Sequence, residues 1–285
     1  MIKLIECPRD AMQGIHQFIP TDIKIKYINS LLNVGFDTLD FGSFVSPKAI
    51  PQLSDTAEVL AGLNLTNTRS KLLAIIANTR GAETAASFEQ IAYLGYPFSI
   101  SETFQRRNTN RGILEAFEDV KIIQEICLKS NKNLVIYISM GFGNPYSDPW
   151  NADFVTEWVS KLSKLGIKIF SLSDTVGSAH IDDISYIFKN IIPAFPSLEF
   201  GAHFHSRVEI QNEKIYAAYA AGCQRFDAAL LGFGGCPMAE DDLVGNTATE
   251  IMLPFLEQQG ENLNLNQEAL AESMNIANEI FSAYF

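Results

Sequence analysis

The side chains in this sequence that are best suited to metal chemistry are two histidines separated by one residue, His203 and His205. On an extended backbone side chains alternate with a period of two, so both imidazoles would point the same way. Asp10 and Asn246 could add a carboxylate and an amide oxygen if the fold brings them to the same place. Such mixed ligands without thiolate favour a roughly octahedral Mg²⁺ or Mn²⁺ over a structural Zn²⁺. An H-x-H on one strand is often only hydrogen-bonded, so the prediction of a metal site depends on that convergence.

Two charged residues are each compatible with two roles. Arg9 precedes Asp10, and the pair could be a surface ion pair of little consequence. Its position just after the first expected strand favours instead a guanidinium directed at a developing oxyanion. Asp174, in the segment SLSDTVG, could serve the site or could be a helix N-cap or Asx-turn residue. The sequence alone does not decide between these two roles of Asp174.

The least ordinary segment is glycine-rich and carries a thiol. Residues 232–237 read GFGGCP, and three glycines in four residues indicate a backbone that moves or approaches a ligand closely. A cysteine at the tip of such a loop is badly placed for core packing. We interpret the segment as a lid that brings Cys236 to the substrate as an acid or base, rather than as a loop with an incidental cysteine.

The elements that must position these residues alternate regularly along the chain. Short β-branched or aliphatic runs are followed by longer stretches of helical periodicity. The expected strands are residues 3–6, 38–41, 72–77, 97–100, 134–138, 168–172, 198–202 and 225–229. The expected helices are residues 21–34, 53–61, 82–94, 111–129, 153–165, 182–192, 210–221 and 246–259, with a last helix near 267–283.

This alternation predicts an α/β fold, a (β/α)8 TIM barrel, as a single domain over residues 1–285. An open doubly wound sheet would normally carry a G-x-G-x-x-G after an early strand, and none occurs there. In a barrel the carboxyl ends of all strands meet on one face, which carries the active site in barrel enzymes. The residues that end or follow expected strands, and would share that face, are Asp10, Asp40, Asn78, Ser139, Asp174, His203, His205, Cys236 and Asn246.

The composition argues against several classes of protein. With 33 acidic and 21 basic residues the net charge is −12, which disfavours binding to nucleic acid or to anionic membranes. No apolar run reaches the ~20 residues of a membrane span. The four cysteines show no close-paired spacing, so we expect a reducing, cytoplasmic setting rather than a disulfide framework.

Taken together, the motifs resemble those of the 3-hydroxy-3-methylglutaryl-CoA lyases, metal-dependent carbon–carbon lyases built on a (β/α)8 barrel. The matching segments, in the family's order, are ECPRDAMQ (6–13), SFVSPK (43–48), SLSDTVG (171–177), HFH (203–205), GFGGCP (232–237) and GN (245–246). The Arg-Asp and His-x-His elements are shared with isopropylmalate and homocitrate synthases. GGCP followed by GN is much more specific to the lyases.

The resemblance implies retro-aldol cleavage of 3-hydroxy-3-methylglutaryl-CoA to acetoacetate and acetyl-CoA, a step of leucine degradation. It implies a Mg²⁺ or Mn²⁺ held by Asp10, His203, His205 and Asn246, with Arg9 and Cys236 catalytic. Asp40 and Asp174 complete the catalytic candidates, and the base could be Asp10, Asp174 or His203. The candidates for substrate and coenzyme A binding are Arg9, Gln13, Ser43, Ser46, Lys48, Asn78, Arg106, Arg107, Asn108 and Ser139. Family members are often dimers, so a homodimer is expected.

The sequence also departs from the family's pattern in three places. Ala11 replaces a glycine, Asp40 stands where the family generally has Glu, and Ser206 follows the second histidine where many members have Asp or Asn. Two alternatives stay open, and these departures suggest the second of them. One is a condensing acyltransferase that joins acetyl-CoA to a 2-oxo acid, and the other is a non-catalytic barrel that binds a thioester or a metal.

Overall fold

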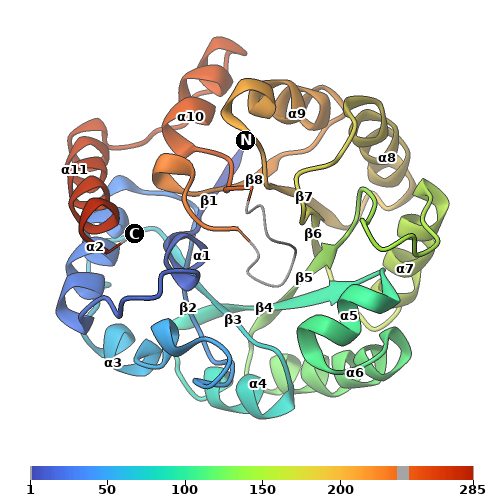
Figure 1. Cartoon of the computed structure of the whole chain (residues 1–285), viewed down its shortest axis with the longest axis horizontal. Coiled ribbons are helices and arrows are strands. Elements are labelled where there is room, and N and C mark those ends of the chain that lie inside the picture. Colours follow the sequence, from blue (N-terminus) through green and yellow to red (C-terminus); the bar gives the residue numbers. More distant parts are fainter. Residues whose placement is uncertain (1, 236–243, 285) are drawn as a thin grey trace.

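The computed structural model describes residues 2–235 and 244–284. Its parallel strands are hydrogen-bonded in sequence order into a closed barrel, with the helices around the outside (Figure 1). The strands are β1 (Lys3–Glu6), β2 (Thr38–Ser43), β3 (Lys71–Ile75), β4 (Ile91–Ser99), β5 (Asn133–Ser139), β6 (Ile169–Asp174), β7 (Glu199–Phe204) and β8 (Arg225–Ala228). The (β/α)8 barrel predicted from the sequence is confirmed.

Most helices follow a strand in the expected alternation. They are α1 (Pro8–Gln13), α2 (Thr21–Val34), α3 (Thr56–Ala61), α4 (Thr79–Ala86), α5 (Glu102–Thr109), α6 (Ile113–Lys129), α7 (Ala152–Ser163), α8 (Ile181–Ala194), α9 (Val208–Ala220), α10 (Thr249–Gln258) and α11 (Gln267–Tyr284), with short 3₁₀ helices η1 (Pro51–Leu53) and η2 (Leu230–Gly232). The sequence did not predict α1 and α5, which are inserted after the carboxyl ends of β1 and β4. None of the helices in the described ranges has the length and hydropathy that a bilayer span needs.

The prediction of a helix over residues 82–94 is wrong. Helix α4 ends at Ala86 and strand β4 already begins at Ile91. A continuous apolar run such as IAYLGY is compatible with a buried helix or with a buried parallel strand, so periodicity does not distinguish them. Gly95 lies inside β4, where a Cβ would come within 2.6 Å of the Ile75 side chain and 3.0 Å of the Tyr137 ring. The glycine therefore makes room for side chains of the neighbouring strands.

The C-terminal helix α11 packs on α2 (Figure 1) and also contacts η2, which follows β8. The Ser273 hydroxyl donates a hydrogen bond to the Ser30 hydroxyl at 3.0 Å. The Phe281 ring packs edge-on against Tyr27 and stacks on Phe233, with centroids 6.4 and 4.3 Å apart respectively. Phe233 is the second residue of the glycine-rich segment 232–237, so α11 contacts that segment directly.

Candidate active site

The arginine and aspartate after β1 are buried at the carboxyl-terminal end of the barrel. Both lie in α1, and the Arg9 guanidinium lies between two carboxylates. Its Nε donates to both oxygens of Asp40 in β2, at 3.0 and 3.2 Å. Its Nη1 donates to Asp10 Oδ1 and to Gln13 Oε1, both at 2.8 Å. Arg9 is therefore a buried, fixed cation and not a surface ion pair.

The two carboxylates beside Arg9 differ in acidity. Burial alone would raise the pKa of Asp10, but the charge of Arg9 and the two nearby histidines hold that pKa well below its ordinary value. For Asp40, burial dominates and the charges of Asp10 and Asp227 add to it, so its pKa rises to about 6 despite the hydrogen bonds from Arg9. Asp10 is thus ionised at neutral pH, whereas Asp40 titrates close to neutrality.

Asp10 forms one group with the two histidines of the H-x-H motif. One potential ligand atom from each of Asp10, His203 and His205 lies within 4.8 Å of the others. The His205 Nδ1 is 2.8 Å from the Thr175 carbonyl oxygen, which can only accept, so Nδ1 carries a proton and, in the neutral ring, Nε2 carries the lone pair. That Nε2 is buried, has no hydrogen-bond partner among the described residues, and lies 3.8 Å from Asp10 Oδ2. An unpaired lone pair facing a carboxylate fits a cation between them.

Asn246 joins this group from the far end of the chain. Its backbone pairs with that of His205 in an isolated antiparallel bridge. Its Nδ2 donates to Asp10 Oδ2 at 2.7 Å and to the Phe233 carbonyl at 2.9 Å. Both hydrogens of the amide are used in these bonds, so Oδ1 is the atom that is available to a cation.

The loop after β8 requires a glycine at position 234. It has a φ of +101°, and a Cβ there would lie 2.6 Å from both the Asn246 Nδ2 and the Asp10 carbonyl. Only glycine allows the chain to pass so close to Asp10. Cys236, proposed as an acid or base on this loop, lies outside the described residues.

The second candidate carboxylate, Asp174, is occupied by other partners. It ends β6, and its carboxylate accepts a hydrogen bond from the buried Lys214 Nζ at 2.6 Å. Both of its oxygens also lie 3.2 Å from the Ala179 amide nitrogen. Lys214 contacts the Gly177 carbonyl at 2.9 Å and the His205 carbonyl at 3.4 Å. These contacts favour a structural role for Asp174, in holding the loop after β6, over a role in the site.

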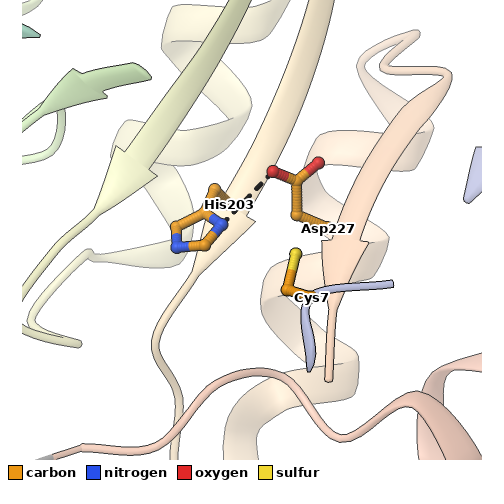
Figure 2. A group of neighbouring side chains, drawn as sticks. All are labelled: Cys7, His203 and Asp227. Atoms are coloured by element: carbon orange, nitrogen blue, oxygen red, sulfur yellow. Dashed lines mark hydrogen bonds and ion pairs between the residues drawn. The ribbon is translucent and has the colours of Figure 1, made fainter. Parts of the chain in front are cut away.

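The sequence did not identify two further charged residues that lie beside the site. Asp227 in β8 is paired in register with His203 of β7, and its Oδ2 lies 3.3 Å from His203 Nδ1 (Figure 2). Lys214 is a buried cation on the inner face of α9. The available signal for Asp227 was an acidic residue within the short strand Arg-Phe-Asp-Ala, and nothing in the periodicity marked Lys214.

The other candidates are spread around the same end of the barrel. Ser43 and Ser139 end β2 and β5 and are buried. Asn78 caps α4, with its Oδ1 accepting from the Gly81 amide at 2.9 Å, while Ser46 and Lys48 lie exposed in the loop after β2. On α5, Arg106 pairs with Glu102 at 2.7 Å, Arg107 covers the Tyr146 ring at 4.6 Å, and Asn108 is partly buried.

A closed parallel barrel with histidine, carboxylate and amide ligands gathered at one end defines a TIM-barrel protein with a candidate metal centre. The family model described as HMGL-like matches residues 2–277, and the chain belongs to that family. Hydroxymethylglutaryl-CoA lyase YngG of Bacillus subtilis is 32% identical, over 92% of this chain and 87% of that protein. The hydroxymethylglutaryl-CoA lyase of Pseudomonas mevalonii is 30% identical, over 95% of this chain and 89% of its own length.

The solved structures agree with the sequence comparison. An HMG-CoA lyase from Acinetobacter baumannii, in complex with coenzyme A and 3-methylmalate, superposes with a TM-score of 0.91 at 30% identity. The superposition covers 99% of this chain and 92% of that one. The HMG-CoA lyase of Bacillus subtilis gives a TM-score of 0.92, also at 30% identity, with 99% and 94% of the two chains covered.

Proposed function

We propose that this protein is a divalent-cation-dependent lyase that cleaves 3-hydroxy-3-methylglutaryl-CoA into acetoacetate and acetyl-CoA. The observation that carries the proposal is the buried group of Asp10, His203 and His205, in which His205 Nε2 has no partner among the described residues. Family membership supplies the substrate, because the relatives named above are hydroxymethylglutaryl-CoA lyases.

Four residues would hold the cation: Asp10 and His205 by the atoms that face one another, His203 by a ring nitrogen and Asn246 by its amide oxygen. Oxygen and imidazole donors without thiolate suit Mg²⁺ or Mn²⁺. Such a cation supplies Lewis acidity that lowers the pKa of the substrate's tertiary hydroxyl and orients it.

Arg9 is proposed to stabilise the negative charge that develops on the thioester oxygen when the carbon–carbon bond breaks. Its contacts with Asp40, Asp10 and Gln13 fix the guanidinium before substrate binds, so little reorganisation is needed. A preorganised donor of this kind contributes about 3 kcal/mol in other enzymes.

Two proton transfers complete the reaction. The hydroxyl must lose a proton to a base. The contacts of Asp174 with Lys214 and Ala179 argue against Asp174, and the two ring nitrogens of His203 face Asp227 and the cation, which leaves Asp10 as the candidate. The carbon released as the methyl of acetyl-CoA must gain a proton, and we assign its donation to Cys236.

The same proposal places the coenzyme A phosphates near the cations of the rim, Lys48, Arg106 and Arg107. Gln13, Ser43, Ser46, Asn78, Asn108 and Ser139 are proposed as the polar contacts of the acyl and pantetheine groups. An acidic protein that binds a polyanionic thioester needs such a local positive patch.

The test is acetoacetate release from the thioester by the purified protein with Mg²⁺ or Mn²⁺, and with EDTA as the metal-free control. We expect turnover that EDTA abolishes, that His205→Ala removes and that the matched change of the exposed His180→Ala leaves intact. Absence of acetoacetate with either cation would overturn the proposal. Release of free CoA from acetyl-CoA and a 2-oxo acid would identify a condensing enzyme instead.

A further inference from the structure

A second buried group lies directly against the first and shares one histidine with it. Figure 2 shows Cys7, His203 and Asp227, whose potential ligand atoms lie within 4.8 Å of one another. The His203 Nδ1 faces Asp227, and the other ring nitrogen lies on the opposite side of the ring. His203 therefore connects a carboxylate inside the barrel to the candidate metal centre.

We propose that Asp227 is a positioning residue, which fixes the tautomer and rotation of His203 so that Nε2 is presented to the cation. This inference rests on the proposed metal site and assigns Asp227 no contact with substrate. An imidazole free to rotate or to exchange tautomers would present a protonated nitrogen part of the time. A carboxylate that accepts the Nδ1 proton removes those states and makes Nε2 a stronger ligand for the cation.

The surroundings of Asp227 argue that this carboxylate does not serve the stability of the fold. Its side chain is fully buried, yet its contacts are long: 3.3 Å to His203 Nδ1, 3.4 Å from the Ser171 hydroxyl and 4.0 Å to Arg225 Nε. Its Oδ1 has no hydrogen-bond partner within residues 2–235 and 244–284. A buried charge so poorly paired costs free energy of folding, and a neutral side chain of the same shape would avoid that cost.

Cys7 cannot replace Asp227 in this role, although it completes the group. Burial, together with the nearby carboxylates, raises the pKa of the Cys7 thiol well above its ordinary value, so the sulfur stays protonated. The thiol lies 3.8 Å from the Ile5 carbonyl oxygen, to which it can donate a hydrogen bond. A neutral thiol is a weak acceptor and offers His203 no charge.

The proposal is tested on the whole, metal-free protein by titration with Mn²⁺ and by nitrogen NMR of its histidines, with His203 assigned from the spectrum of His203→Gln. At a pH at which the His203 ring is neutral, we expect the wild type to carry the ring proton on Nδ1. The shape-conserving variant Asp227→Asn should lose that preference and bind Mn²⁺ about 10- to 100-fold more weakly. Its unfolding midpoint in urea without metal should be equal or higher. Cys7→Ala is the matched control from the same group, and its Mn²⁺ affinity should stay within about twofold.

Several outcomes would contradict the proposal. A neutral wild-type His203 that carries its single ring proton on Nε2 overturns it, even if Asp227→Asn does not fold. Equal Mn²⁺ affinity in the wild type and Asp227→Asn also overturns it, as does an equal loss in Cys7→Ala. A protein that binds Mn²⁺ with the expected tautomer but releases no acetoacetate would refute the lyase proposal and leave this one standing.

Discussion

At the scale of single residues, Arg9 is the group on which the proposed chemistry depends most directly. It is a buried guanidinium whose donors are divided between Asp40, Asp10 and Gln13. A lysine at this position would keep the charge but could not reproduce the planar, multiple contacts. The residue should therefore contribute more to the transition state than to metal binding.

We expect Arg9→Lys to lower kcat for acetoacetate release by about 10²- to 10³-fold. Its affinity for Mn²⁺ should change little, because Arg9 is not a proposed ligand. The measurements are steady-state kinetics and Mn²⁺ titration, with Arg69→Lys as the control, since Arg69 hydrogen-bonds to Gly35 away from the site. Turnover close to that of the wild type would remove Arg9 from the mechanism.

Gly234 offers a steric test of the same site. We expect Gly234→Ala to weaken Mn²⁺ binding at least about tenfold, because the new Cβ must displace Asn246 or the Asp10 backbone. Gly143→Ala is a matched control: its φ of +117° is equally unfavourable, but no atom lies within 4 Å of the new Cβ. Both proteins are compared by calorimetric titration, and an equal effect on both would attribute the loss to backbone strain alone.

At the scale of elements, much of the site could be predicted, because residues that follow the strands of a barrel all lie at the same end of it. Asp10, His203 and Asn246 could be brought together from the alternation of strand and helix alone. The short helices α1 and α5 could not be predicted, since six to eight residues carry too little periodicity. Asp227 and Lys214 were missed for another reason. Their roles depend on which neighbouring strand or loop they face, which only tertiary contacts reveal.

The buried ion pair between Lys214 and Asp174 links α9 to the end of β6 and the loop that follows it. We expect Lys214→Met to lower the free energy of unfolding by about 3–5 kcal/mol, because it leaves a buried carboxylate without its cation. Lys161→Met, which breaks an exposed pair with Glu157, should cost less than about 1 kcal/mol. Urea denaturation of both variants measures the difference. If the two losses are similar, the buried pair does not brace the loop.

Glu6 links β1 by hydrogen bonds to residues that follow β8. Its carboxyl accepts from the Leu230 amide at 2.8 Å and from the Thr249 hydroxyl at 2.6 Å. Burial, with a contribution from the charge of Glu250, raises its pKa from 4.5 to about 8, despite these hydrogen bonds. The folded state therefore binds a proton more tightly than the unfolded state does. Stability from Glu6 is fully present below pH 4.5 and is lost as the pH rises toward 8.

We expect Glu6→Gln to remove this dependence on pH. The unfolding free energy of the wild type should fall relative to that of the variant as the pH rises from 4.5 to 8. The limiting slope of that difference is about 1.4 kcal/mol per pH unit. Parallel urea denaturation series across this range measure it. Two parallel curves would show that Glu6 ionises in the folded protein as it does in the unfolded chain.

At the scale of the whole molecule, the candidate metal ligands come from the first and from the last part of the amino-acid sequence. Asp10 follows β1, whereas Asn246 precedes α10, so a bound cation would connect segments that are 236 residues apart. A cation that binds only the folded state stabilises it by about 2.7 kcal/mol at a concentration of 100 Kd.

We therefore expect Mg²⁺ or Mn²⁺ to raise the melting temperature of the protein and EDTA to reverse the rise. His205→Ala should melt at the same temperature with and without the cation, whereas His180→Ala should respond like the wild type. Differential scanning calorimetry at several cation concentrations measures the shift. A melting temperature that ignores both cations in the wild type would argue against the metal centre.

The stacking of Phe281 on Phe233 has a practical consequence for work with this protein. The Phe233 carbonyl accepts a hydrogen bond from the Asn246 side chain. Helix α11 packs on Phe233 through Phe281 and so supports the candidate metal ligand Asn246. Trimming α11, or attaching a purification tag to its end, would disturb catalysis from a distance and mimic a damaged active site. A tag placed ahead of β1 emerges at the opposite rim of the barrel and leaves this support untouched.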